Sequence, residues 1–242
     1  MRTSNPALGP QTFDLPTPTT VESRMTLPGT IQKSFILLVL AALSACFSWS
    51  TASGIGMTLG IGGAIGGFVV CLVLCFKKEW APGLAPAYAI LEGLFLGAIS
   101  AAMERVYTGI VAQAVMLTFG TFFALLAAYS TGLIKATENF KLGVVAATGG
   151  IFLVYLVSGI FRLFGSRIPF IHDSGMIGIA FSAFVVVIAA LNLVMDFDFI
   201  EDGCKSGGPR YLEWYAAFGL MVTLVWLYIE ILRLLAKLRS RE

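Results

Sequence analysis

Long apolar runs, separated by short polar or charged segments, divide the chain from residue 34 onward. Residues 34–76 contain no charged side chain. As one helix this run would be roughly 65 Å long, about twice the ~30 Å hydrocarbon core of a bilayer. It therefore predicts two helices, at about 34–51 and 55–76, joined by a turn in the polar segment 48–54.

The remaining apolar runs predict five more helices, each bounded by charges, prolines or glycines. They cover about 81–103, a stretch within 106–134, about 142–162, Ser174 to the acidic run 196–202, and a start between Tyr211 and Gly219 to about Leu238. The sequence thus predicts an all-α integral membrane protein, with a bundle of seven transmembrane helices over residues 34–242.

Residues 1–33 precede the first apolar run and are rich in Pro, Thr and Ser. Such a segment buries too little apolar surface to fold alone, so we expect a disordered N-terminal tail. A secretory signal peptide would place its apolar region much nearer Met1.

Composition and charge agree with a membrane protein. The chain is 57% hydrophobic and only 12% charged, whereas soluble domains carry about 25% charged residues. The net charge is +2, and basic residues lie singly at the ends of apolar runs, so we expect the lipid bilayer and no nucleic acid as a partner.

The distribution of Lys and Arg predicts the orientation. With seven spans, the N-terminal tail and the second, fourth and sixth loops carry nine basic residues, against seven on the other side, four of them at the C-terminus. We predict a cytoplasmic N-terminus. If the last apolar run lay on the membrane surface instead, both ends would be cytoplasmic.

Three carboxylates fall inside or at the end of predicted spans. Glu92 lies at the middle of 81–103, where a charge costs about 2.5–3.5 kcal/mol on insertion scales. Asp196 is predicted to end the sixth helix, and Glu230 lies in the seventh. An ionisable group in the membrane is a functional candidate by default. Polar neighbours of these acids are secondary candidates: Asp198, Asn192, Tyr88 and Arg233.

Each acid also has a purely structural interpretation. Glu92 could be a protonated carboxyl hydrogen-bonded within the bundle, and Glu230 could pair with Arg233 three residues later. Asp198, Glu201 and Asp202 could be a solvated helix end.

The sequence argues against an intramembrane enzyme, a bound metal and a cofactor. The only histidine, His172, lies in a predicted loop, and there is neither an H-E-x-x-H motif nor a Gly-x-Gly-Asp motif. The four cysteines form no C-x-x-C pair and are interpreted as buried small hydrophobes, with Cys204 in a loop.

Three short stretches resemble the Bax-inhibitor family of membrane proteins, as a bacterial-type member. They are Glu92–Ser100 (EGLFLGAIS), Met195–Ile200 (MDFDFI) and Leu227–Leu235 (LYIEILRLL). The resemblance implies a seven-helix bundle whose last helix is surrounded by the others, in the bacterial inner membrane. It also implies a pH-sensitive Ca²⁺ leak governed by two acids, which match Asp196 and Glu230.

The spacing of the two acids departs from the family, because the 34 residues from Asp196 to Glu230 exceed the usual distance. Asp196 and Glu230 lie at the same depth in the membrane only if residues 209–218 lie outside the membrane core. If the last helix enters the core at Tyr211, Glu230 lies about 28 Å along it and the pair cannot form.

We therefore expect a leak pathway for Ca²⁺ or another cation. Two carboxylates close together at low dielectric cannot both ionise easily, so they share a proton and respond to pH. Once deprotonated, they offer the oxygen ligands that Ca²⁺ prefers. The alternative is a non-transport regulator of a membrane protease or a stress or cell-death pathway, with a membrane-protein partner bound by the N-terminal tail.

Overall fold

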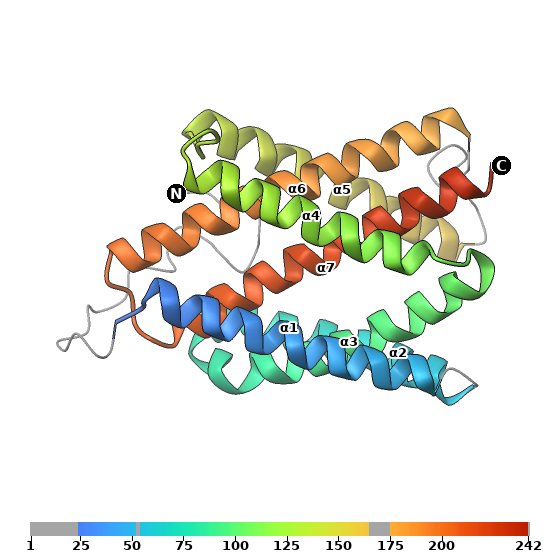
Figure 1. Cartoon of the computed structure of the whole chain (residues 1–242), viewed down its shortest axis with the longest axis horizontal. Coiled ribbons are helices and arrows are strands. Elements are labelled where there is room, and N and C mark those ends of the chain that lie inside the picture. The colour runs from blue at the N-terminus through green and yellow to red at the C-terminus, as the bar shows by residue number, and fades with distance from the viewer. Residues whose placement is uncertain (1–23, 52–53, 165–174, 242) are drawn as a thin grey trace. The chain divides into compact units, whose positions relative to one another are not determined.

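The computed structural model describes residues 24–51, 54–164 and 175–241. Most of the predicted tail, and the segment that contains His172, lie outside these residues. The described chain contains seven α-helices and a 3-10 helix, and no β-strand (Figure 1).

The helices are α1 (Leu27–Ser50), α2 (Ile55–Phe76), η3 (Lys78–Trp80), α3 (Ala81–Val106), α4 (Ile110–Ser130), α5 (Glu138–Leu163), α6 (Met176–Lys205) and α7 (Leu212–Arg239). All seven α-helices in the described chain are long and apolar enough to cross a membrane. The predicted fold class is confirmed, and α7 is long enough to span. The central position of the last helix stays a prediction.

Two predicted helix ends were wrong. The first helix begins at Leu27 instead of 34, because the Thr26 hydroxyl accepts a hydrogen bond from the Gly29 amide and Pro28 occupies the first turn. The predicted tail is therefore shorter than 1–33. The sixth helix continues past Asp196 to Lys205, so Asp196 and Cys204 both lie within α6.

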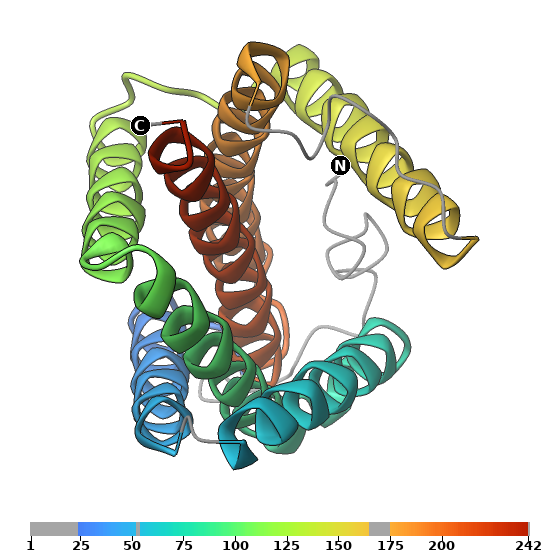
Figure 2. The same ribbon diagram turned by 90° about the vertical axis from the view of Figure 1, so that its right-hand side faces the viewer.

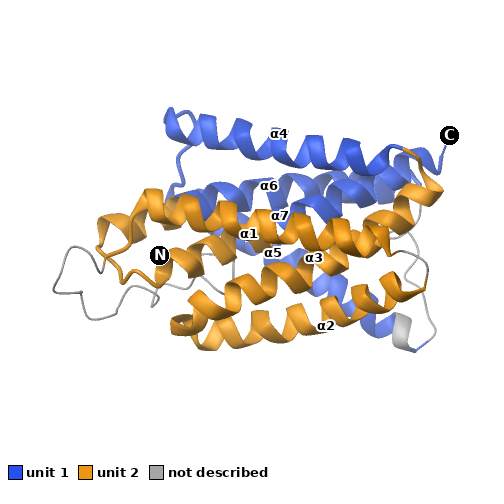
Figure 3. Ribbon diagram, turned by 60° about the horizontal axis from the view of Figure 1, so that its bottom comes forward, with its two compact units in different colours: residues 1–5, 109–197, 223–242 blue, residues 6–108, 198–222 orange. Residues whose placement is uncertain are grey.

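The chain divides into two compact units, each described here by itself (Figure 3). Unit 2 contains α1, α2 and α3, and takes residues 198–222 from the end of α6 and the start of α7. Within it α3 packs against both α1 and α2 (Figure 2). At Gly63 of α2 a side chain would collide with the Leu91 carbonyl of α3, so the absence of a side chain lets these helices approach closely.

Unit 1 contains α4, α5, residues 176–197 of α6 and the part of α7 from Thr223 onward. Its core includes Ile151 of α5 with Val185 and Ile188 of α6, and Trp226 of α7 packs against this cluster. The aromatic ring of Phe197 lies against Phe122 of α4, with ring centroids 5.7 Å apart. These contacts fix how α5, α6 and α7 face each other in unit 1.

In unit 2 the start of α1 is fastened to the start of α7. The Met25 amide donates to the Gly208 carbonyl (2.6 Å), and the Thr26 hydroxyl donates to Glu213 Oε1 (2.7 Å). Lys33 forms an ion pair with Glu213. We call these contacts, from Met25 to Gly208 and from Thr26 and Lys33 to Glu213, the N-terminal clasp.

Candidate ion site in the membrane helices

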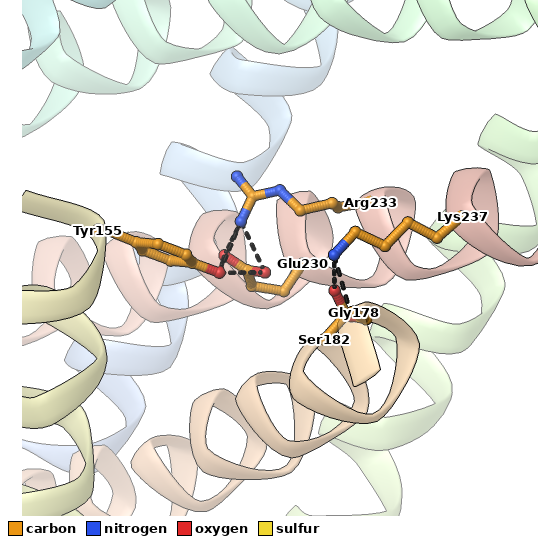
Figure 4. A network of polar contacts seen from close by, with 6 residues as sticks. All are labelled: Tyr155, Gly178, Ser182, Glu230, Arg233 and Lys237. Carbon is orange, nitrogen blue, oxygen red and sulfur yellow. Dashed lines mark hydrogen bonds and ion pairs between the residues drawn. The ribbon is translucent and has the colours of Figure 1, made fainter. Parts of the chain in front are cut away.

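Glu230 lies at the centre of a polar network in unit 1, although only 1% of its surface is exposed (Figure 4). Arg233 Nη1 donates to Glu230 Oε1 at 2.8 Å and to Oε2 at 3.0 Å. The Tyr155 hydroxyl, from α5, donates to the same carboxylate at 3.1 and 3.0 Å. The predicted local pair between Glu230 and Arg233 is therefore present, and a second helix supports it.

Two further contacts complete the surroundings of this carboxylate. Arg233 Nη1 also donates to the Tyr155 hydroxyl at 2.7 Å, and the Trp226 indole donates to Glu230. The Arg233 side chain is 37% exposed, whereas that of Glu230 is 2% exposed. The guanidinium thus covers the buried carboxylate from the more open side.

Lys237 provides a second buried cation on α7. Its Nζ donates to the Gly178 carbonyl (3.0 Å) and to Ser182 Oγ (2.9 Å), both on α6 (Figure 4). The contact places the end of α7 against the start of α6. Neither Lys237 nor Ser182 was predicted as part of a site, although Lys237 follows Arg233 by one turn.

The antiparallel register of α6 and α7 puts Asp196 and Glu230 at different depths. Because Lys237 contacts Gly178 and Ser182, Glu230 lies opposite the middle of α6. Asp196 lies a further two to three turns along α6, about 10–16 Å away. The structure therefore places the two acids at separate levels and not side by side.

Asp196 itself is buried, with 2% of its surface exposed. Asn192, one turn earlier on α6, is also buried and donates to Thr148 Oγ1 of α5 (2.9 Å) and to the Ile188 carbonyl (2.8 Å). The predicted polar pair on α6 thus lies inside the protein, with Asn192 fixed against α5.

In unit 2 Glu92 faces α2. Its Oε2 lies 2.9 Å from where a side chain on Gly67 would begin. Among the residues that the structure describes, Glu92 accepts no hydrogen bond and forms no ion pair, so the hydrogen-bonded interpretation finds no partner there. Tyr88, one turn earlier, is buried and packs edge-to-face on Phe218 at 4.8 Å.

The remaining acids at the α6–α7 turn differ in exposure. Asp198 is half-buried, and Glu201 is 45% exposed and pairs with Lys205 at 2.5 Å. Glu213 is buried with 1% exposed, because the N-terminal clasp supplies its counter-charge and hydrogen bonds. Its partners lie about 180 residues earlier, so no local pattern could reveal them.

No group of three or more His, Cys, Asp or Glu side chains in the described chain is arranged to hold a metal ion. The cysteines Cys46, Cys71, Cys75 and Cys204 are free thiols, and Cys46 is exposed on α1, contrary to its predicted burial. The buried carboxylates of unit 1 are Asp196 and Glu230 among the described residues, and Glu230 is paired with Arg233.

Comparison with known proteins adds one finding. Residues 5–240, almost the whole chain, match the family model described as Bax inhibitor 1 like. No curated protein and no solved structure matches the chain.

Proposed function

Because the chain belongs to the Bax-inhibitor-1-like family of membrane proteins, we propose that it is a pH-sensitive cation leak pathway, with Ca²⁺ as the expected permeant ion. Seven helices able to span a bilayer and acids buried among them support this proposal. Buried carboxylates in membrane helices line ion and proton pathways more often than they serve packing alone.

The observation that carries the proposal is the occupied Glu230 carboxylate. Arg233, on the same helix, forms an ion pair with it, and Tyr155 of α5 donates hydrogen bonds to it. A permeant cation that reaches Glu230 must compete with the Arg233 guanidinium for the ionised carboxylate. Conduction needs binding that is weak enough to release the ion.

Protonation of the acids would control the pathway. A neutral Glu230 attracts neither Arg233 nor Ca²⁺, and a neutral Asp196 removes a second negative charge from α6. The other charged or titratable groups that face Glu230 are Tyr155 of α5 and Arg233. We expect cation flux to rise as the pH rises and the carboxylates ionise.

The test is Ca²⁺ influx into liposomes that contain the purified protein, measured between about pH 6 and pH 8. Native protein should conduct more at the higher pH. Glu230→Gln and Asp196→Asn should each flatten the pH dependence. Glu201→Gln is the matched control, because it removes an exposed acid of the same helix end and should leave the profile unchanged.

Two outcomes would contradict the proposal of a cation leak controlled by the buried acids. If Asp196→Asn and Glu230→Gln both keep the native flux and pH profile, the acids do not gate the pathway. If native protein conducts no better than empty liposomes at any pH, the regulator hypothesis takes its place. Deletion of residues 1–23, which spares the N-terminal clasp, should then abolish binding of a membrane-protein partner.

A further inference from the structure

A second set of polar groups lies in unit 2, apart from Glu230. It joins the α2–α3 turn to the middle of α3 and includes residues from α2, α3 and the start of α7. Its members, which we call the Glu92 polar row, are Lys78, Cys75, Cys71, Tyr215, Tyr88 and Glu92.

The members of the row lie within interaction distance of one another. Cys71 and Cys75 are one turn apart on α2, so their thiols lie on the same face of the helix. Cys71 and Tyr88 both interact electrostatically with Glu92, and Tyr215 interacts with both thiols.

The row extends from the membrane edge to the middle of a span. Lys78 lies in η3, just before α3, and its Nζ is 5.8 Å from the centre of the Tyr215 ring. Glu92 lies eleven residues after Ala81, the first residue of α3, so it is about 17 Å further along the helix. The row therefore covers about half of a ~30 Å hydrocarbon core.

Two members have unfulfilled hydrogen-bonding capacity. Tyr215 is fully buried at 0% exposure, yet its hydroxyl has no hydrogen-bond partner in the described part of the chain. The Glu92 carboxyl is half-buried and also accepts no hydrogen bond from the described residues. Buried polar groups in native proteins are hydrogen-bonded to protein or to water in the large majority of cases. A buried hydroxyl and a half-buried carboxyl in one row, both without a protein partner there, indicate that water supplies the partners.

We propose that the Glu92 polar row is a water-accessible route from the α2–α3 turn to the Glu92 carboxyl. Its ligand is water, which bonds to the Tyr215 hydroxyl and to Glu92 and connects the carboxyl with the aqueous phase. The α6–α7 turn lies at the same end of unit 2, since Met25 binds Gly208 and Tyr215 lies beside Lys78. The route thus opens on the side of the N-terminus.

The native cysteines make the route testable without measuring ion flux. A methanethiosulfonate reagent with a fixed positive charge reaches only thiols in contact with water. The thiolate attacks the reagent's sulfenyl sulfur, a mixed disulfide forms, and methanesulfinate leaves. The reaction would be followed by mass spectrometry on protein in liposomes that retains one thiol, with the other cysteines replaced by alanine.

Leu72→Cys in the cysteine-free protein is the matched control, since Leu72 follows Cys71 at nearly the same depth but is 44% exposed on the outer surface of α2. We expect Cys71 and Cys75 to react at least about tenfold faster than this thiol, because a thiolate in lipid is suppressed. Cys204, at the end of α6, reports which side of the vesicle carries the route.

Glu92→Leu removes the polar end of the row and should slow the reaction of Cys71 several-fold, with little effect on Cys75, which lies nearer the edge. The proposal is overturned if Cys71 and Cys75 react as slowly as the Leu72→Cys thiol while the membrane-permeant N-ethylmaleimide modifies all three. A positive result stands even if the protein conducts no Ca²⁺, so the two proposals fail independently.

Discussion

At Glu230 a carboxylate with 1% of its surface exposed is stabilised by a guanidinium, a phenol and an indole. The Tyr215 hydroxyl is just as buried but has no hydrogen-bond partner in the described chain. Burial of an unsatisfied polar group costs about 1–3 kcal/mol, whereas a hydrogen bond to a charged group contributes about 1.5–3 kcal/mol. Loss of the hydroxyl should therefore cost more at Tyr155, which donates to Glu230, than at Tyr215.

Tyr155→Phe should destabilise the protein by about 1.5–3 kcal/mol, because Glu230 and Arg233 both lose a hydrogen bond. Tyr215→Phe should change stability by less than about 0.5 kcal/mol, because no bond to the described protein is lost. Thermal unfolding in detergent micelles checks both. Equal losses in the two variants would contradict the difference in bonding on which the prediction rests.

Single residues of the candidate site were predictable only where their partner is local. Arg233 lies three residues after Glu230, a spacing that places both on one helix face, so their pairing could be predicted. Tyr155 reaches Glu230 from 75 residues away, and its position depends on how α5 packs against α7. A tyrosine far from the ends of an apolar run is the one signal that could have suggested a polar partner.

At the scale of elements, the glycines of α2 divide into two kinds. Gly63 faces α3, where a side chain would collide with the Leu91 carbonyl, whereas a side chain on Gly62 would meet no atom within 4 Å. Glycine in a helix interior is less stable than alanine by about 0.5–1 kcal/mol. Close packing against α3 requires glycine at position 63, whereas no described neighbour requires glycine at position 62.

Gly63→Ala should therefore destabilise the protein by about 1–3 kcal/mol, the usual cost of overpacking. Gly62→Ala, its neighbour, should stabilise the protein by about 0.5–1 kcal/mol through helix propensity. Midpoints of thermal unfolding for the two variants and the native protein give the comparison. A stabilised Gly63→Ala variant would mean that α2 and α3 pack less closely than described.

Hydrophobicity predicted the existence of each helix but not every end. The bounds of α2 were predicted as observed, because charges and a glycine-containing turn flank it. The start of α1 was missed because its first turn is polar, although Thr26 and Pro28 are a cap signal. The end of α6 was missed because its last turns are acidic; their exposed Glu201–Lys205 pair is formed only within a helix.

At the scale of the whole molecule, the described chain contains seven α-helices that are long and apolar enough to cross a membrane, and seven crossings would place the two termini on opposite sides. Together with the distribution of basic residues, this predicts a cytoplasmic N-terminus and a C-terminus across the membrane. Alkaline phosphatase fused after Glu242 should be active in a bacterial host, whereas the same enzyme fused before Met1 should be inactive. Activity at neither or at both ends would require an even number of crossings.

The N-terminal clasp has a consequence for biosynthesis. Thr26 and its acceptor Glu213 are 187 residues apart in the chain. At translation rates of about 5–20 residues per second, roughly 10–40 s pass between their synthesis. During that interval Lys33 has no Glu213 to neutralise it, so it remains a free positive charge when α1 is inserted and its orientation chosen. The same lysine is thus available as a topology signal during insertion, and it becomes the partner of the buried Glu213 once the last helix emerges from the ribosome.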